Sequence, residues 1–321
     1  MDLIFVIGAG TMGLDIAQTF AQAGHPVTVR DVSEEILTRA KARLESGLEK
    51  RVARGKLARE DADALLSRIA FTTELASAKE AALVIEAIVE RADVKKSVFQ
   101  ELDGICSAET IFASNTSSIS ITDIASATKR PDRCIGMHFF NPATVMKLVE
   151  VIRGVGTSDE TFAAVQAFAV AIGKEPVQVK ECPGFVVNRI LIPMINEAVG
   201  LYAEGIASAE GIDTAMRLGC NHPMGPLQLG DLIGLDVVLA IMDTLFAETH
   251  DGKYRAHPLL RKYEHESIEQ VMLDRSGLYI RLFYPAGRML TYRFEMHGLH
   301  PIPEDRLYPL AQALGVDLKD L

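Results

Sequence analysis

Four polar residues lie in otherwise apolar or glycine-rich surroundings: Ser117, His138, Glu150 and Asn188. A lone histidine in an apolar strand is often an ordinary core residue. Two unrelated buried ionisable residues are costly, however, so His138 and Glu150 are better interpreted as a pair. If residues 143–146 turn the chain, the two strands pair and Glu150 lies beside His138. A carboxylate partner fixes the tautomer of an imidazole and strengthens it as a base, which suits general acid–base catalysis.

Ser117 and Asn188 each have two interpretations. Ser117 follows a buried strand, and in a doubly wound sheet the carboxyl ends of strands face the ligand crevice. Its hydroxyl, or a neighbouring one, is equally suited to cap the next helix. Asn188 begins a helical pattern after Pro183-Gly184. It either faces a cleft between two domains or caps that helix.

A glycine-rich loop at residues 8–13 has the pattern G-x-G-x-x-G, with a buried strand before it and an amphipathic helix after it. Gly8 allows the tight turn, Gly10 lets the backbone approach a pyrophosphate, and Gly13 lets helix and strand pack closely. The N–H groups and positive dipole at the helix N-terminus favour phosphates. The loop therefore predicts a dinucleotide site.

Asp31 ends the second predicted strand, about 20 residues after the loop, where an acid is expected to bind the ribose hydroxyls. A 2′-phosphate there would meet a carboxylate, so NAD is favoured over NADP. Arg30 weakens this preference, because a guanidinium beside the site is able to recruit a phosphate.

The elements that position these residues alternate between strands and helices in the first half of the chain. The expected strands are Leu3–Ile7, Val27–Arg30, Ile69–Phe71, Ala82–Glu86, Ile111–Ser114, Cys134–Phe140, Lys147–Ile152 and Pro176–Val179. The longest expected helices among them are Ser33–Lys56 and Val94–Cys106. Such alternation predicts an α/β fold with a Rossmann-type, doubly wound parallel sheet.

The pattern of apolar residues changes after Cys182. Helical spacing covers Phe185–Glu204, Ser208–Leu218 and Leu227–Glu248, and strand-like runs are absent until about Tyr279. Pro183-Gly184 punctuates the chain, so we expect a domain boundary there. The predicted domains are residues 1–182, with the dinucleotide site, and residues 183–321, mainly α-helical.

The composition of the chain argues against several classes of binding partner. The formal charge of −10 argues against a nucleic-acid or anionic-membrane binder. The four cysteines are far apart with no C-x-x-C pair, so no metal site or disulfide framework is expected. No basic segment precedes the first strand, and the longest apolar stretch contains charged residues, so no signal peptide or membrane span is expected. The expected compartment is the cytoplasm.

Several motifs in order resemble the L-3-hydroxyacyl-CoA dehydrogenase family, with the nearest likeness to the short-chain bacterial 3-hydroxybutyryl-CoA dehydrogenases. The segments that carry the resemblance are Gly8–Gly13, Ser114–Ser118, Gly136–Pro142, Pro183–Leu191 and His222–Asp236. The likeness is continuous from Met1 to about Lys262.

The resemblance implies an NAD-dependent enzyme that moves a hydride at C3 of a 3-hydroxyacyl-CoA ester. It implies that His138 transfers the proton of the 3-oxygen, that Glu150 holds and polarises His138, and that Ser117 and Asn188 position the substrate. It also implies a homodimer formed through the C-terminal domain.

The same resemblance assigns further residues to ligands. Those implied to line the NAD site are Gly8, Gly10, Thr11, Met12, Gly13, Asp31, Glu90, Lys95, Asn115 and Asn141. In the basic segment after Asp31, the candidates for the CoA phosphates are Lys50, Arg54 and Lys56. The alternative for these three is a solvated charged face.

The family pattern stops in the tail, Tyr263–Leu321. Leu290, Tyr292, Phe294 and Met296 alternate like a strand, and residues 303–315 are typical of a short helix. The tail is either an evolved extension or the product of a shifted reading frame, and sequencing the coding DNA distinguishes the two.

Two other functions stay open at this point. One is a dehydrogenase of a CoA-free 3-hydroxy acid, such as carnitine or gulonate. The other is an NAD-binding protein without activity.

Overall fold

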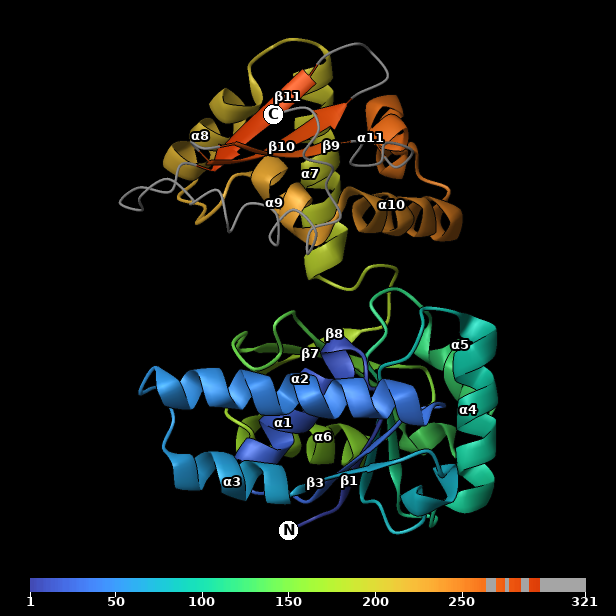
Figure 1. Ribbon diagram of the computed structural model, residues 1–321. Coiled ribbons are helices and arrows are strands. Elements are labelled where there is room, and N and C mark those ends of the chain that lie inside the picture. The colour runs from blue at the N-terminus through green and yellow to red at the C-terminus, as the bar shows by residue number, and fades with distance from the viewer. Residues whose placement is uncertain (264–269, 275–276, 284–288, 295–321) are drawn as a thin grey trace. The chain divides into compact units, whose positions relative to one another are not determined.

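The computed structural model describes residues 1–263, 270–274, 277–283 and 289–294 (Figure 1). The chain forms two compact units. The N-terminal unit comprises Met1–Ile190 and Ala247–Thr249, and the C-terminal unit comprises Leu191–Phe246 and His250–Leu321.

The N-terminal unit is built on an eight-stranded sheet in the order β3-β2-β1-β4-β5-β6-β7-β8. All neighbours pair in parallel except β6 and β7, which are antiparallel. The strands are β1 Ile4–Ile7, β2 Val27–Arg30, β3 Ile69–Thr72, β4 Leu83–Glu86, β5 Ile111–Ser114, β6 Cys134–Phe139, β7 Leu148–Arg153 and β8 Glu175–Lys180. The predicted α/β fold and its eight strands are confirmed, with ends that differ by a residue.

Helices cover both faces of this sheet (Figure 1). On one face α1, α2 and α6 contribute Phe20, Leu44 and Val165 to the larger core, and on the other α4 and α5 contribute Phe99 and Ile124. The helices of this unit are α1 Thr11–Gln22, α2 Glu34–Ala53, α3 Arg59–Ser67, η1 Leu75–Ala78, α4 Ala92–Ile105, α5 Ile121–Ala125, η2 Pro131–Arg133 and α6 Asp159–Ala171. The predicted helix 33–56 ends earlier than expected, at Ala53.

The order of the strands indicates where the ligand crevice lies. Strand β1 lies between β2 and β4, so the winding direction reverses beside it. Ligands of doubly wound sheets bind outside the carboxyl ends of the strands at such a switch point. Here those ends are Ile7 and Glu86, and Ile7 is followed directly by the glycine-rich loop.

Buried side chains hold the turn between β6 and β7 by hydrogen bonds. The buried Lys174 donates to Ala143 O at 2.5 Å and Met146 O at 2.8 Å, and Thr19 Oγ1 donates to Ala143 O at 3.4 Å. Burial lowers the pKa of Lys174 from its usual value. The turn expected at residues 143–146 is therefore present, and its position is fixed by buried hydrogen bonds.

The C-terminal unit is mainly helical, as predicted, around a core that includes Ile195, Val199, Met242 and Leu245. Its helices are α7 Val187–Ala203, which begins in the N-terminal unit, α8 Ala209–Gly219, α9 Pro226–Ile233, α10 Leu235–Thr249, η3 Gly252–Tyr254 and α11 Pro258–Tyr263.

The single helix predicted over residues 227–248 is wrong. Gly234 has φ 101° and separates α9 from α10. That conformation suits glycine and no other common residue, so the backbone turns there. The Asp213 carboxylate of α8 accepts from Leu227 N at 2.8 Å and Gln228 N at 3.0 Å, and this satisfies the start of α9.

Three strands follow α11, β9 Gln270–Asp274, β10 Gly277–Phe283 and β11 Met289–Phe294. They form an antiparallel sheet in the order β11-β10-β9. Among the described residues after α11, strand structure thus begins at Gln270, before the position near Tyr279 that the sequence indicated. The strand expected around Leu290–Phe294 is present, whereas Met296 and the helix expected at 303–315 lie outside the described residues.

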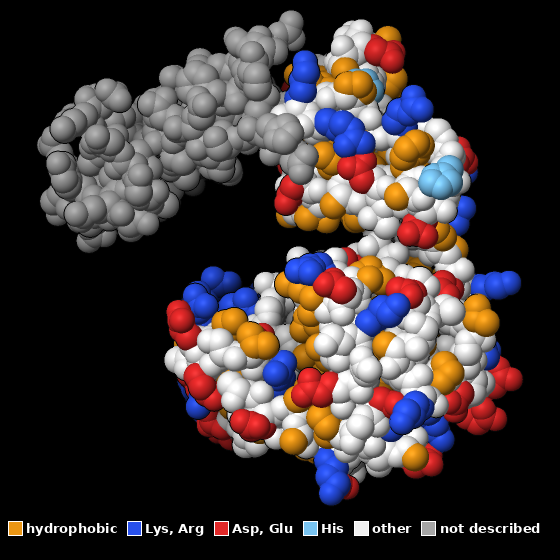
Figure 2. All heavy atoms as spheres, turned by 90° about the vertical axis from the view of Figure 1, so that its right-hand side faces the viewer, with side chains coloured by type: hydrophobic (Ala, Val, Ile, Leu, Met, Phe, Trp, Pro, Cys, Tyr) orange, Lys and Arg blue, Asp and Glu red, His pale blue; other side chains and the backbone are white. Residues whose placement is uncertain are grey.

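The surface of the N-terminal unit carries both signs of charge. Figure 2 shows acidic and basic side chains interspersed over the face that it draws. Within the part of the chain that the structure describes, no helix combines the length and apolar character needed to cross a membrane.

Candidate active site

His138 and Glu150 form a buried pair. They are Cα partners in the antiparallel pairing of β6 and β7, and Glu150 Oε2 lies 2.8 Å from His138 Nδ1. Their side chains are 8% and 1% exposed. The juxtaposition expected from the sequence is therefore found. With Nδ1 bonded to the carboxylate, Nε2 is the ring atom left for proton exchange.

Two aromatic rings enclose the imidazole. The ring centroids of Phe140 and Phe185 lie 4.6 Å and 5.6 Å from that of His138. Phe185 is buried and has φ 50°, a left-handed conformation that bulky residues seldom adopt. Neither ring was predicted from the sequence, although Phe140 lies two residues from His138 and Phe185 follows the predicted Pro183-Gly184 boundary.

The second oxygen of Glu150 binds the backbone that leads into α7. Oε1 accepts from Val186 N and from Val187 N, both at 3.0 Å. These N–H groups lie at the start of the helix, where no preceding helical carbonyl accepts from them, and the carboxylate satisfies them. Glu150 is thereby held at both oxygens, and its orientation toward His138 is fixed.

Glu90 accepts hydrogen bonds from the loop that contains Ser117. Its Oε1 accepts from Ser117 N at 2.9 Å, Ser117 Oγ at 3.2 Å and Thr116 Oγ1 at 2.5 Å. Burial would raise the pKa of Glu90, but the Lys95 ammonium at 3.2 Å and these donors lower it below its usual value. The cap of α5 is Ser120, whose Oγ accepts from Asp123 N, so Ser117 does not cap that helix.

Lys95 and Glu86 form a second buried ion pair, and of the two only Lys95 was predicted as a site residue. The Nζ–Oε1 distance is 2.6 Å, and the side chains are 1% and 0% exposed. Glu86 also accepts from Ser114 Oγ at 2.6 Å and Ile88 N at 2.7 Å. The available signal for Glu86 was a carboxylate that ends an apolar strand, nine residues before a lysine.

The three candidate asparagines have different surroundings. Asn115 Oδ1 accepts from Phe139 N at 2.8 Å, so it holds the end of β6 beside His138. Asn141 is exposed and follows that strand. Asn188 is half-buried and is the second residue of α7, and within the described residues its side chain makes no hydrogen bond. Asn188 therefore does not cap the helix.

The glycine-rich loop fits a dinucleotide. At Gly8, with φ 102°, a Cβ would lie 2.4 Å from Ala87 O, and at Gly13 it would lie 1.8 Å from Gly8 O. At Gly10 it would meet nothing within 4 Å, so the space beside the loop is open. Gly10 is also the N-cap of α1 and provides no side-chain cap, which leaves the first-turn N–H groups for a ligand. Of the next residues, Thr11 is exposed and Met12 is half-buried against the core.

Asp31 is held against the glycine-rich loop. Its Oδ2 accepts from Ala9 N and its Oδ1 from Val32 N, each at 2.7 Å. A carboxylate has about four acceptor sites, so capacity remains for ribose hydroxyls. Arg30 Nε donates to Thr73 O at 3.1 Å, which turns that part of the guanidinium toward the backbone of the neighbouring segment.

Lys50, Arg54 and Lys56 are exposed at the end of α2 and just beyond it. Within the described residues none of the three has a carboxylate at ion-pair distance, whereas Arg39 pairs with Glu35 at 3.8 Å. The three cations are therefore available to an anionic ligand. The structure does not bring them together with the His138 pair.

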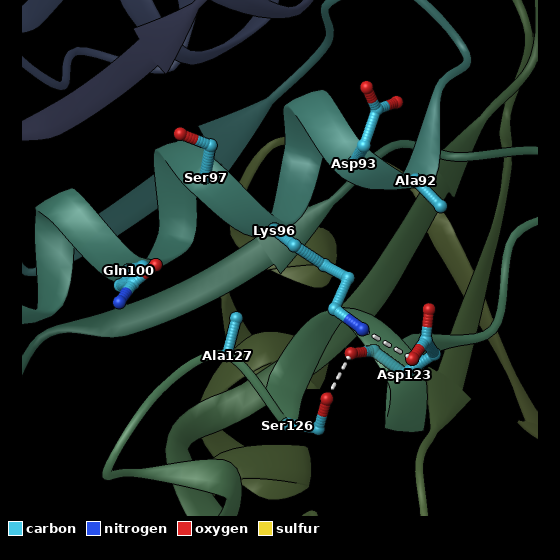
Figure 3. Close-up of a pocket in the computed structure, with 8 residues that line it drawn as sticks. All are labelled: Ala92, Asp93, Lys96, Ser97, Gln100, Asp123, Ser126 and Ala127. Carbon is cyan, nitrogen blue, oxygen red and sulfur yellow. Dashed lines mark hydrogen bonds and ion pairs between the residues drawn. The ribbon is translucent and has the colours of Figure 1, made fainter.

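A separate hollow of about 730 Å³ lies between α4 and α5 (Figure 3). Across it Lys96 Nζ binds Asp123 Oδ1 at 2.7 Å, and Ser126 Oγ donates to Asp123 O at 2.7 Å. Its lining residues are Ala92, Asp93, Lys96, Ser97, Gln100, Asp123, Ser126 and Ala127. None of the predicted site residues lines it. Over the described ranges, no group of three or more His, Cys, Asp or Glu residues is placed to hold a metal ion.

Two family models match the chain in succession. Residues 3–182 match the 3-hydroxyacyl-CoA dehydrogenase NAD binding domain, and residues 184–271 match the 3-hydroxyacyl-CoA dehydrogenase C-terminal domain.

Individual relatives agree with these models. The chain is 57% identical over 257 residues to 3-hydroxybutyryl-CoA dehydrogenase of Clostridioides difficile. The matched region covers 80% of this chain and 92% of the relative. It is 49% identical over 247 residues to the human mitochondrial hydroxyacyl-coenzyme A dehydrogenase, covering 75% of this chain and 78% of that protein. Among solved structures, (S)-3-hydroxybutyryl-CoA dehydrogenase from Ralstonia eutropha superimposes with a TM-score of 0.79 at 49% identity, covering 81% of this chain and 92% of the other.

Proposed function

Because the chain belongs to the 3-hydroxyacyl-CoA dehydrogenase family, we propose that His138 and Glu150 are the acid–base pair of its reaction. The reaction is the NAD-linked interconversion of (S)-3-hydroxyacyl-CoA and 3-oxoacyl-CoA, and the proposed substrates carry short acyl chains. The observation that carries the proposal is the buried hydrogen bond of 2.8 Å between the two side chains.

His138 moves the proton. In oxidation its Nε2 takes the proton of the substrate 3-hydroxyl, and in reduction it returns that proton to the 3-oxygen. Glu150 keeps Nδ1 protonated, so the Nε2 lone pair faces the substrate, and it stabilises the imidazolium that forms. A bound nicotinamide would supply the redox chemistry, with NAD as the hydride acceptor for C3 in oxidation and NADH as the hydride donor in reduction.

Other residues position the two ligands. Ser117, fixed by Glu90, and Asn188, whose amide is free for a ligand within the described part of the chain, are the proposed substrate-positioning residues. Lys50, Arg54 and Lys56 are proposed to hold the CoA phosphates. The proposed NAD contacts are Gly8, Gly10, Thr11, Met12, Gly13, Asp31, Glu90, Lys95, Asn115 and Asn141.

We expect the purified chain to oxidise NADH in the presence of acetoacetyl-CoA, with NADPH supporting a kcat/KM at least about tenfold lower. The second expectation follows from Asp31, since placing like charges together at a binding site costs several kcal/mol. Absorbance of the reduced nicotinamide measures both rates. Turnover of carnitine or gulonate with none of any acyl-CoA would contradict the assignment of substrate. NADH binding without any turnover would support the non-catalytic alternative.

The domain boundaries and the assembly are also proposals. We propose that residues 1–182 form the NAD-binding domain and residues 183–321 the substrate and dimerisation domain. The family-model limits at residues 182 and 184 support this division, although the compact units divide at Ile190 and Leu191.

We propose a homodimer formed through the C-terminal unit, which has Ile206, Leu218 and Leu232 exposed at 67%, 78% and 71%. Light scattering is expected to give twice the chain mass. The chain mass alone, at concentrations used for assay, would contradict the dimer.

A further inference from the structure

Arg43 is a cationic side chain that reaches the glycine-rich loop from another element. It lies in the middle of α2, Glu34–Ala53. Its Nη2 donates to Gly10 O at 2.9 Å, and its Nη1 lies 3.4 Å from Thr11 Oγ1. Gly10 is the N-cap of α1 and Thr11 its first residue. The guanidinium therefore lies where the loop enters the helix.

The charge of Arg43 is not neutralised by a close ion pair. Within the described residues, no carboxylate lies at ion-pair distance from it, while Arg39 of the same helix pairs with Glu35 and Arg59 pairs with Glu49. Its charge acts on Asp15 in α1. Burial raises the pKa of Asp15 above its usual value, and the Ala143 N–H and the Arg43 charge oppose that rise only in part.

Within the part of the chain that the structure describes, the remaining donors of Arg43 have no hydrogen-bond acceptor. A guanidinium carries five N–H donors in a rigid fork, and at most two of these are used here. The side chain is exposed, and the space beside Gly10 is open. An anion at the start of α1 therefore meets the first-turn N–H groups and the guanidinium together. The planar fork suits phosphate oxygens better than an ammonium does.

We propose that Arg43 binds the diphosphate of the nicotinamide dinucleotide. The inference rests on the proposed function only in that NAD is the ligand of this loop. It adds to the glycine-rich motif a residue from α2, thirty residues beyond the motif's end, that no spacing rule links to it. Arg43 is distinct from Lys50, Arg54 and Lys56, which lie farther along the chain and, among the described residues, form no side-chain hydrogen bond with the loop or α1.

The test compares binding in three variants of the full chain. Arg43→Gln removes the charge, Arg43→Lys keeps it without the fork, and Arg39→Gln is the control one helical turn away on the same helix. Dissociation constants are measured by calorimetry for NADH, for ADP-ribose, which retains the diphosphate, and for adenosine, which lacks it. The measurements are made at low and at high salt.

Arg43→Gln is expected to raise the Kd of NADH and of ADP-ribose about three- to tenfold at low salt. Adenosine affinity and the KM for acetoacetyl-CoA are expected to stay within about twofold of wild type, because neither probe involves this diphosphate contact. Added salt is expected to reduce the loss, since the side chain is exposed. Arg43→Lys is expected to lie between Gln and wild type, and Arg39→Gln to match wild type.

An unchanged ADP-ribose Kd in Arg43→Gln would overturn the inference, as would an equal loss for adenosine. A loss confined to acetoacetyl-CoA would place Arg43 in the CoA site instead. Because binding is measured without turnover, the two proposals fail separately. An Arg43-dependent Kd in a chain that turns over no acyl-CoA would retain this inference and reject the function.

Discussion

Replacing His138 with alanine is expected to lower kcat about 10²- to 10⁴-fold, the usual contribution of a positioned general acid or base. In the proposed mechanism, the 2.8 Å bond to Glu150 fixes this ring for proton transfer at Nε2. The Kd of NADH is expected to stay within about twofold, since no contact of the glycine-rich loop involves this ring. Stopped-flow reduction of acetoacetyl-CoA and NADH titration measure the two quantities. A wild-type rate in the variant would contradict the mechanism.

Glu150→Gln separates orientation from proton transfer. The amide keeps the size of the side chain, and its oxygen can still accept from Val186 N and Val187 N. Its NH₂ group would then face Nδ1 and favour the tautomer with the proton on Nε2. We expect kcat to fall with little change in the KM for acetoacetyl-CoA. A fall in NADH affinity as large as the fall in kcat would indicate a folding defect instead.

Lys95→Met is expected to destabilise the N-terminal unit by about 3–5 kcal/mol. The change leaves the Glu86 carboxylate, which is 0% exposed, without its cation. For a unit of this size, the melting temperature is expected to fall on the order of 10 °C. The double variant Glu86→Gln/Lys95→Met is expected to recover part of that loss, because the uncompensated charge is gone.

Lys96→Met is the matched control for Lys95→Met. Lys96 is the next residue of α4, but its side chain is 35% exposed and its partner Asp123 is 49% exposed (Figure 3). Exposed pairs of this kind contribute about 0–1 kcal/mol. A loss in Lys95→Met no larger than that in Lys96→Met would show that burial of the Glu86–Lys95 pair has no energetic consequence.

The fold was predictable because its strands are short apolar runs bounded by polar residues. The sheet of the N-terminal unit follows from that pattern, and the strand containing His138 and the strand containing Glu150 were expected to pair. The same pattern wrongly predicted one helix where Gly234 separates α9 from α10. Apolar spacing continues on both sides of that glycine, so periodicity gave no sign that φ becomes positive there.

The site was predictable where a motif or a short separation specified it. The glycine-rich loop and the His138–Glu150 pair are of this kind. Glu86, Phe185 and Arg43 act through contacts between distant segments, such as Arg43 with Gly10 across 33 positions. No periodicity or local spacing encodes such a contact, so it becomes visible only after the chain has folded.

The Glu150 side chain must reach two partners at once. One oxygen serves the imidazole, and the other serves the backbone that leads into α7, a helix that continues into the C-terminal unit. Aspartate is one methylene shorter, so from the same backbone position its carboxylate would lie farther from both partners. In the proposed mechanism, proton transfer at His138 and the path of the chain into α7 therefore depend on one carboxylate. The contacts to Val186 N and Val187 N alone require only an acceptor oxygen at this reach, which glutamine also supplies.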